Sequence, residues 1–144
     1  MGNDCIFCNL RHERIIGECD DTITFIDSYP ATPGHTLVIP KRHFPSFFEA
    51  TEDELLAIGK AIQKAKAVLD KEFTPDGYNI GINVGEAAGQ SVEHLHVHIM
   101  PRYKGDVEDP RGGVRWILRN KANYHDIKKH DLKRHDIKKH EKNS

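Results

Sequence analysis

Residues 94–100 read His-Leu-His-Val-His-Ile-Met, and this stretch decides how the surrounding chain is interpreted. A β-strand alternates its side chains between two faces, so a strand here directs His94, His96 and His98 to one face and the apolar residues to the other. Near neutral pH an imidazole serves as a base, a nucleophile or a metal ligand. Three in one row indicate a chemical site, and a half-buried strand whose polar face is histidine by chance is the alternative.

Short apolar runs bounded by turn residues indicate further strands. We predict five in all, at residues 15–19, 22–28, 35–39, 78–84 and 93–102. The first two form a hairpin, because only a short polar turn separates them. A Pro/Gly segment at residues 29–34 leads into the third strand, and Pro40 stops it.

One long helix is predicted between the third and fourth strands. Thr51 followed by Glu54 is a capping-box signature for a helix start. Apolar residues then recur at three- and four-residue spacing, at positions 55, 58, 62, 65, 69 and 73. The helix therefore covers residues 51–73. With hairpin links and no repeated strand-helix-strand units, the order of elements predicts an α+β fold in which the helix covers one face of an antiparallel sheet.

The chain has 144 residues, 38% of them hydrophobic, and a formal net charge of -1, which suits one globular domain with a real core. We expect a cytoplasmic protein, because neither a secretory leader nor a membrane span is visible in the sequence. We assign the domain to residues 1–124 and separate residues 125–144 as a basic, His/Lys-rich tail.

The tail repeats Asp-Ile/Leu-Lys-Lys/Arg-His at residues 126–130, 131–135 and 136–140. Its seven Lys or Arg and four Asp or Glu give it a net charge of about +3. The lone apolar residues are five apart, so neither a helix nor a strand gains an apolar side. We therefore predict a solvated, mobile appendage, with metal binding or nucleic-acid contact through its histidines as the alternative.

Cys5 and Cys8 form a Cys-x-x-Cys pair near the N-terminus. Two thiolates at this spacing bind one zinc ion but leave a tetrahedral site incomplete, so two further ligands must come from elsewhere. His43, after the third strand, and His94 complete the site if their strands are neighbours. A thioredoxin-type redox pair, which expects a strand before it and a helix after it, and two cysteines without metal are the alternatives.

Together these motifs resemble the histidine triad family of nucleotide hydrolases and transferases. Besides the triad, the segments that carry the resemblance are CIFC at 5–8, FID at 25–27, PGHTLVIPKRH at 33–43, GINVGEAAGQSVEHLHVHIMPR at 81–102 and RGGVR at 111–115. The resemblance covers residues 4–124 and implies an α+β fold with a five-stranded antiparallel sheet. It also implies a homodimer whose two sheets join into one of ten strands.

The resemblance implies that His96 is the nucleophile, which attacks phosphorus and forms a covalent nucleotidyl-imidazole that water later releases. His98, Gln90 and Ser91 are implied to hold the phosphate oxygens. Asn83 is implied to lie near the phosphates or the leaving group, and His35 to stand behind the phosphate site.

For the nucleoside, the resemblance places Asp27 against the ribose hydroxyls. It implies that the base is walled by Ile6, Phe7, Phe25 and Ile26. Ordinary core packing is an equally good interpretation of Phe25 and Ile26.

In zinc-bearing relatives the first histidine of the triad ligates zinc beside the Cys-x-x-Cys pair, and in relatives without the cysteines it only supports the nucleophile. Because all four residues are present here, the resemblance implies a structural zinc held by Cys5, Cys8, His43 and His94. Four protein ligands leave no open position for water.

The function implied is a nucleotidyl hydrolase or transferase that cleaves the α-phosphate bond of purine nucleotides. Dinucleoside polyphosphates and nucleoside phosphoramidates are the candidate substrates, and a dinucleoside polyphosphate phosphorylase is a variant within this class. The alternative from another class is a non-catalytic nucleotide-binding or interaction module. We expect a purine nucleotide and a second copy of the chain as partners, and neither a membrane nor nucleic acid.

Overall fold

The computed structural model describes residues 4–119. Residues up to Asp106 belong to one compact unit, and the chain from Val107 onward belongs to a second. The described part of the second unit contains one short 3-10 helix, η4 (Gly113–Ile117). From this helix the Trp116 indole Nε1–H donates to the Arg111 carbonyl at 2.9 Å. The predicted domain boundary at residue 124 and the tail at 125–144 lie outside the described residues.

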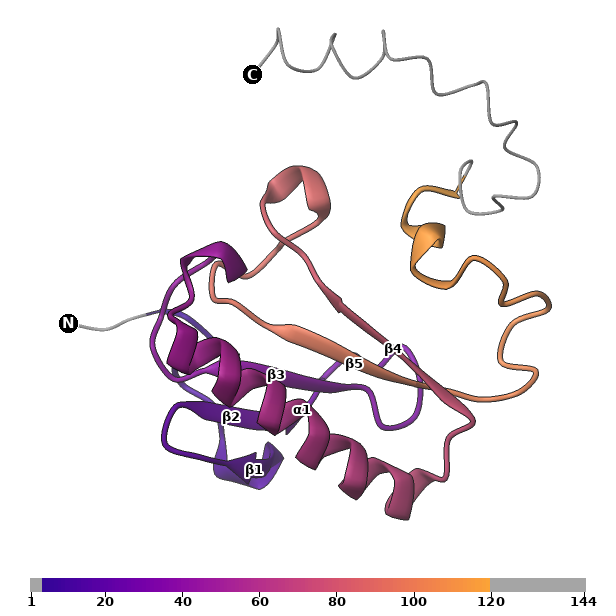
Figure 1. Ribbon diagram of the computed structural model, residues 1–144, viewed down its shortest axis with the longest axis horizontal. Coiled ribbons are helices and arrows are strands. Elements are labelled where there is room, and N and C mark those ends of the chain that lie inside the picture. The colour runs from indigo at the N-terminus through magenta and orange to yellow at the C-terminus, as the bar shows by residue number, and fades with distance from the viewer. Residues whose placement is uncertain (1–3, 120–144) are drawn as a thin grey trace, which may run out of the picture. The chain divides into compact units, whose positions relative to one another are not determined.

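A five-stranded antiparallel sheet forms the framework of the first unit (Figure 1). Its strands are β1 (Ile15–Glu18), β2 (Thr22–Ile26), β3 (Thr36–Pro40), β4 (Gly77–Ile82) and β5 (Val97–Arg102). They lie in the order β1-β2-β3-β5-β4, so β5 inserts between β3 and β4. Three 3-10 helices lie in the connections, namely η1 (His12–Arg14), η2 (Phe47–Glu49) and η3 (Glu86–Ala88). The predicted fold class, with five antiparallel strands and one long helix, is confirmed.

The histidine strand begins later than predicted, at Val97 instead of residue 93. Ahead of Val97 the chain no longer pairs with β3, and its next backbone hydrogen bond goes to the segment that follows β3. The Leu95 amide donates to the Phe44 carbonyl at 2.7 Å, a single bond that does not continue as a ladder. Only His98 of the three histidines therefore lies within a strand.

The helix α1 (Glu52–Phe73) starts with the capping box that the sequence predicts. The Thr51 hydroxyl accepts a hydrogen bond from the Glu54 amide, and the Glu54 carboxylate accepts one from the Thr51 amide. The buried face differs slightly from the predicted stripe, because Leu55 is 39% exposed and Ala61 is buried. The buried residues of α1 are Glu54, Ile58, Ala61, Ala65 and Leu69. Within residues 4–119 no helix is both long and apolar enough to cross a membrane.

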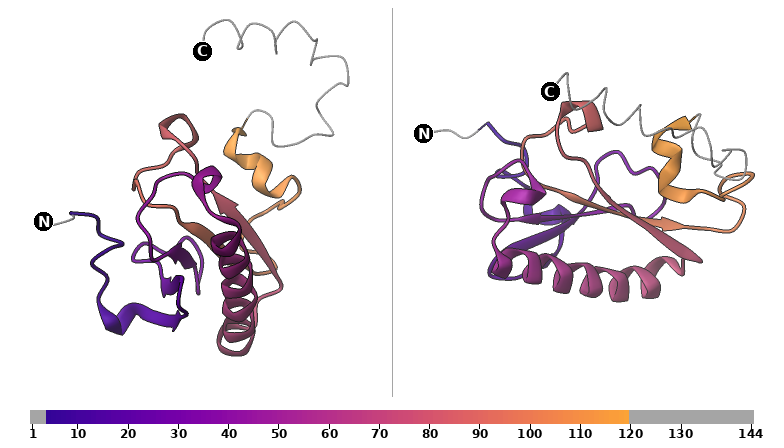
Figure 2. Two further views of the ribbon diagram at one scale, coloured as in Figure 1. Left: turned by 60° about the vertical axis from the view of Figure 1, so that its left-hand side comes forward. Right: turned by 45° about the horizontal axis from the view of Figure 1, so that its top comes forward.

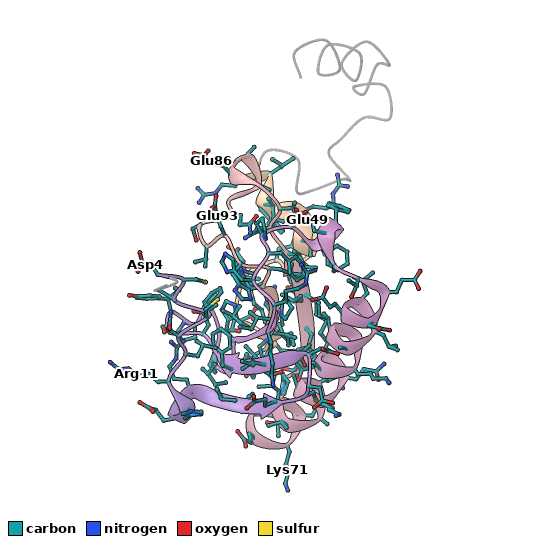
Figure 3. All side chains as sticks on the ribbon, turned by 90° about the vertical axis from the view of Figure 1, so that its left-hand side faces the viewer. Asp4, Arg11, Glu49, Lys71, Glu86 and Glu93 are labelled. Carbon is teal, nitrogen blue, oxygen red and sulfur yellow. The ribbon has the colours of Figure 1, made fainter. Side chains whose placement is uncertain are left out.

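Both faces of the sheet are covered, which positions the site. Figure 2 shows α1 running along one face, and there the helix packs on Val38, Leu95, Val97 and Ile99. On the opposite face Phe7 from the N-terminal segment packs with Phe25, Leu37 and Ile39. Charged side chains such as Lys71 and Glu86 point outward (Figure 3). Leu95, Val97 and Ile99 thus enter the helix-side core, and the histidines between them lie on the opposite face.

A tight turn before β3 depends on Gly34, which has φ +84°. A Cβ at this position would lie 3.1 Å from the Phe73 ring and 3.2 Å from Pro101. Glycine is therefore required for both backbone conformation and space. The turn brings His35 to the start of β3 and toward His98, because Leu37 of β3 pairs with His98 of β5.

Candidate functional site

Four segments that are distant in the sequence meet on the face of the sheet opposite α1. They are the N-terminal segment, the loop between β2 and β3, the segment after β3, and the stretch that carries the three histidines. Two neighbouring groups of side chains result. We call Cys5, Cys8, His43 and His94 the metal cluster, and we call His96 and His98 the imidazole pair.

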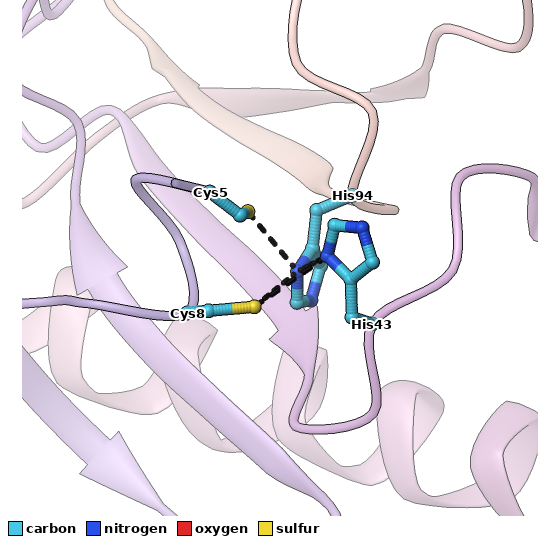
Figure 4. Close-up of side chains that lie close together, drawn as sticks. All are labelled: Cys5, Cys8, His43 and His94. Atoms are coloured by element: carbon cyan, nitrogen blue, oxygen red, sulfur yellow. Dashed lines mark hydrogen bonds between the residues drawn. The ribbon is translucent and has the colours of Figure 1, made fainter. Parts of the chain in front are cut away.

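The metal cluster brings four ligand atoms within 4.8 Å of one another. The Nδ1 atoms of His43 and His94 are 3.1 Å apart. The Cys8 sulfur lies 3.5 Å from each of these nitrogens, and the Cys5 sulfur lies 3.6 Å from the His94 nitrogen (Figure 4). A tetrahedral zinc ion requires edges of about 3.3 Å between nitrogens and about 3.6 Å between sulfur and nitrogen. The four residues therefore fit a metal ion of this kind.

The protonation of His94 suits this role. Its Nε2 lies 2.7 Å from the Pro40 carbonyl oxygen, which can only accept, so Nε2 carries the proton. Burial lowers the pKa of His94, which favours the neutral ring. A neutral imidazole with its proton on Nε2 keeps the Nδ1 lone pair for a metal, and metal-bound histidines commonly have such a carbonyl partner.

The surroundings of the Cys-x-x-Cys pair do not match the thioredoxin-type alternative. The Cys8 amide donates to the Cys5 carbonyl at 3.1 Å, which closes a turn. The chain continues into the three-residue η1 and then into β1, where the redox motif requires a long helix. The pair is instead placed to contribute two sulfur ligands from one turn.

His96 has the opposite tautomer from His94. Its Nδ1 lies 2.8 Å from the His94 carbonyl oxygen, so Nδ1 carries a proton, and in the neutral ring Nε2 keeps the lone pair. The ring is held between two others, with the Phe7 centroid at 5.0 Å and the His98 centroid at 5.1 Å. His96 is 6% exposed, so it is almost fully buried in this state. Its fixed ring and unprotonated Nε2 are what a nucleophilic imidazole requires.

A chain of hydrogen bonds sets the tautomer of His98. The Ala31 amide donates to His35 Nδ1 at 3.0 Å, so a neutral His35 carries its proton on Nε2. That Nε2 is 3.0 Å from His98 Nδ1 and donates to it, which leaves the His98 proton on Nε2. Burial, together with the nearby His96 and His35 rings, lowers the pKa of His98 to about 4. Burial also lowers the pKa of His35, although Asp27 opposes the change. At neutral pH His98 is therefore an uncharged Nε2–H donor.

Asp27 follows β2 directly and lies beside this chain. One carboxylate oxygen accepts from the Tyr29 amide at 2.9 Å, and the other lies 3.5 Å from His35 Nε2. Its side chain is 17% exposed, so it remains reachable from the surface. The loop closes on itself through the Asp27 amide, which donates to the His35 carbonyl at 2.9 Å.

The loop before the triad is organised by Gln90. Its side-chain oxygen accepts from the Gly85 amide at 2.9 Å, and its side-chain nitrogen donates to the carbonyls of Pro45 at 2.8 Å and Val92 at 3.1 Å. The amide of Gln90 is thus occupied by backbone groups. Ser91 follows it and is exposed, and Asn83 is half-buried just after β4.

The four predicted base-contacting residues fall into different environments. Phe25 is 0% exposed and stacks against Phe7 at 5.4 Å, so in this structure it belongs to the core. Phe7 is also buried, whereas Ile26 is half-buried and Ile6 is 62% exposed. Of the two interpretations of Phe25, core packing is the one that its burial favours.

Two residues that the sequence reasoning missed, Pro40 and Ala31, act through their backbone. The carbonyl of Pro40, the amide of Ala31 and the carbonyl of His94, which was expected to support the nucleophile, select the protonated nitrogen in three histidines. No side-chain pattern signals such a role, because every residue carries the same backbone groups. The sequence reasoning also missed Arg42, which lies beside His43.

Comparison with known proteins agrees with this geometry. The model of the HIT domain family matches residues 11–105. An uncharacterised HIT-like protein of Methanocaldococcus jannaschii is 44% identical over 108 residues, which cover 72% of this chain and 83% of that one. The asymmetrical bis(5'-nucleosyl)-tetraphosphatase of Schizosaccharomyces pombe is 42% identical over 99 residues, covering 69% and 54%. The crystal structure of a HIT family member from Bacillus subtilis superposes with a TM-score of 0.66 at 38% identity, covering 72% and 76%.

Proposed function

The chain belongs to the HIT domain family, and from this membership and its site geometry we propose that it is a nucleotidyl hydrolase or transferase. One observation carries the proposal. The His94 carbonyl holds the proton of His96 on Nδ1, so the Nε2 lone pair lies beside the neutral donor His98. A module that only binds nucleotide has no need for an imidazole in this tautomer.

The proposed reaction has two displacements at one phosphorus atom. In the first, His96 Nε2 forms a bond to the α-phosphorus of a purine nucleotide, and the leaving group departs with the electron pair of its own bond. In the second, water attacks the same phosphorus, which releases the nucleoside monophosphate and returns the lone pair to Nε2. His98 donates its Nε2–H to a phosphate oxygen, where charge is greatest during both steps.

The remaining residues are assigned to binding. Asp27 accepts from the ribose hydroxyls, and Ser91 and Asn83 lie at the phosphate end. Gln90 acts by holding the loop that presents Ser91, because its amide is bonded to the backbone at both ends of that loop. Ile6, Phe7 and Ile26 line the base.

Two classes of substrate suit this chemistry, dinucleoside polyphosphates and nucleoside phosphoramidates. Both release a nucleoside monophosphate from a histidine intermediate, and they differ only in the leaving group. The name of the tetraphosphatase relative supports the first class. When inorganic phosphate replaces water as acceptor, the enzyme acts as a phosphorylase.

The metal cluster is proposed to hold one structural zinc ion, through Cys5, Cys8, His43 and His94. The sulfur and nitrogen donors are those that zinc prefers, and four of them complete a tetrahedral shell. The ion supplies a cross-link between the N-terminal turn and two other segments, which stabilises a small domain. Bond making at phosphorus is left to His96.

We further propose a homodimer formed along β4. Among the described strands β4 pairs only with β5, so its other edge has no partner within residues 4–119. Ile80 on this strand is 47% exposed. Light scattering should give twice the chain mass of 16.4 kDa, and the chain mass itself would contradict the dimer.

The decisive experiment measures product and intermediate together. The protein is incubated with a fluorogenic adenosine phosphoramidate and, separately, with diadenosine tetraphosphate labelled at the α-phosphate, and AMP release is followed. Quenching in alkaline denaturant should trap label on the wild-type chain and none on His96→Ala, because a phosphorus–nitrogen bond to imidazole survives in alkali and is broken by acid. Nucleotide binding without product or label would support the non-catalytic alternative, and ADP formed only with added phosphate would identify a phosphorylase.

A further inference from the structure

Arg42 connects the metal cluster to the start of the long helix. Its guanidinium makes two hydrogen bonds to the Glu54 carboxylate, from Nε at 3.1 Å and from Nη2 at 2.7 Å. The same Nη2 lies 3.3 Å from the Glu49 carbonyl, and the guanidinium carbon lies 4.0 Å above the Phe44 ring. Arg42 therefore contacts η2, α1 and the residue that follows His43.

The Glu54 carboxylate is a fixed acceptor. Its side chain is 10% exposed, and it also accepts from the Thr51 amide in the capping box. Hydrogen bonding to Arg42 is the main reason that the pKa of Glu54 falls to about 2. The carboxylate is thus charged and held from the helix side, which restricts where the guanidinium can lie.

Residues 40–45, the segment that Arg42 anchors, contact the stretch that carries the histidines and the loop before it. The Pro40 carbonyl accepts from His94 Nε2, and the Phe44 carbonyl accepts from the Leu95 amide. The Pro45 carbonyl accepts from Gln90, and His43 approaches His94 in the metal cluster. Four contacts from this short segment thus hold the chain around His94, and the His94 carbonyl orients His96.

We propose that Arg42 is a positioning residue that sets the place of His96. Through its hydrogen bonds to Glu54 and its contact with the Phe44 ring, it fixes the backbone of residues 42–44, and with it the carbonyl of Phe44 and the ring of His43. These two groups hold His94 and Leu95, and the His94 carbonyl then aims the His96 ring. Arg42 is 52% exposed but Glu54 only 10%, so removing Arg42 leaves a nearly buried carboxylate without its main partner and also lowers the free energy of unfolding. The effect on geometry is therefore measured where every variant is folded.

The proposal rests on the proposed function for its kinetic part, and it has two readouts that do not. Arg42→Met keeps an apolar stem over Phe44 but loses the hydrogen bonds to Glu54 and Glu49, and Arg42→Lys keeps the charge but loses the planar fork. The matched control is Lys41→Met, which removes a neighbouring ion pair, Lys41 to Glu18 at 2.9 Å, that leads to β1 instead of α1. All variants are compared well below their melting temperatures.

Arg42→Met should lower kcat for the adenosine phosphoramidate by about tenfold to a hundredfold, with KM changed by less than about twofold, because misplacement affects the reacting geometry more than binding. Zinc should pass to a chromogenic chelator about tenfold faster, and amide hydrogen exchange at residues 94–96 should rise by a similar factor. Arg42→Lys should resemble Arg42→Met, and Lys41→Met should resemble the wild type.

Three results would overturn the positioning role. The first is that both Arg42 variants exchange amide hydrogens and release zinc at the same rates as Lys41→Met. The second is that Arg42→Met changes KM alone, and the third is that Arg42→Lys behaves like the wild type. If the wild type releases no AMP from either substrate, the proposed function fails. The exchange of the Leu95 amide in Arg42→Lys still decides the role of Arg42 in that case, because it requires neither substrate nor metal.

Discussion

The metal cluster and the imidazole pair each take a histidine from residues 94–98, and although His94 and His96 are only two residues apart, they offer different nitrogens. In His94 the Pro40 carbonyl holds the proton on Nε2, and Nδ1 faces the two cysteines. In His96 the His94 carbonyl holds the proton on Nδ1, and Nε2 remains available. The difference lies in which backbone acceptor each ring meets, so a histidine's role here follows from its carbonyl partner.

The two groups are also coupled by one peptide. The His94 ring belongs to the metal cluster, while its carbonyl belongs to the imidazole pair. The experiments below test whether the chemistry of one group can be removed while the other is preserved.

The largest effect is expected from His96→Ala. Loss of the nucleophile should reduce turnover on the order of a thousandfold or more, while nucleotide binding stays measurable. Zinc content should not change, because the metal cluster uses the ring of His94. Steady-state kinetics, calorimetric binding and elemental analysis measure the three quantities, and nearly normal turnover in a pure preparation would refute the covalent mechanism.

Replacing both cysteines, as Cys5→Ser with Cys8→Ser, should remove about one zinc per chain and lower the melting temperature by roughly 10 °C. Some turnover should survive, since bond making at phosphorus is assigned to His96. The measurement belongs on a chain that ends at Tyr124, because the tail histidines could bind metal. If the chain that ends at Tyr124 and keeps both cysteines contains no zinc, the proposed site is wrong. If turnover falls in strict proportion to zinc content, the ion is not structural.

The pH dependence of the free energy of unfolding should report the protonation of His98. An unfolded His98 binds its proton near pH 6.5, whereas the folded one binds it only near pH 4. The unfolded state therefore binds more protons in between, and the free energy of unfolding contributed by His98 falls as pH drops from about 6.5 to about 4. The groups that face His98 are His35, His96 and Asp27.

Denaturant titrations of the wild type and His98→Asn across this pH window measure that contribution. The wild type should lose stability more steeply than the variant as pH falls, and metal loss in acid affects both proteins alike. Parallel curves for the two proteins would show that His98 binds its proton equally well in the folded and unfolded chains.

The smallest effect is expected from truncation after Tyr124. Ordering residues 125–144 would cost conformational entropy with little apolar burial in return, so kcat should stay within about twofold. If the basic tail attracts polyphosphates, KM should rise mainly at low salt, where exposed charges are least screened. A large, salt-independent fall in kcat would instead assign part of the active-site wall to the tail.

Much of the fold was predictable because its signals are local. The Thr51 and Glu54 capping box placed the helix start correctly, and the alternation of the 94–100 stretch assigned its apolar residues to the core. The start of β5 was not predictable, because its pairing with both β3 and β4 ends at Val97, and only the tertiary structure shows where neighbouring strands part. Leu55 was predicted on the buried face of the helix and is 39% exposed. The three- and four-residue spacing predicts a band of apolar residues, but only packing decides which side of that band is buried.

The four ligands of the metal cluster were predictable as a set, because cysteine and histidine are few and their chemistry is distinctive. The contacts that orient them were not. The hydrogen bonds of Gln90 to backbone groups could not be foreseen from its predicted place at the phosphate, and Arg42 gave no signal beside the conspicuous His43. Long charged and amide side chains reach many partners, so only the folded chain selects one.

By itself the sequence determined the kinds of chemistry in this protein, namely two thiols, a row of imidazoles and an antiparallel α+β framework to carry them. Residue type and spacing suffice for this, because they act over a few residues. The tertiary structure decided which nitrogen of each imidazole is protonated and which ring meets a sulfur. That decision rests on the carbonyls of Pro40 and His94 and the amide of Ala31. Such backbone groups are alike at every position and differ only in where the fold puts them.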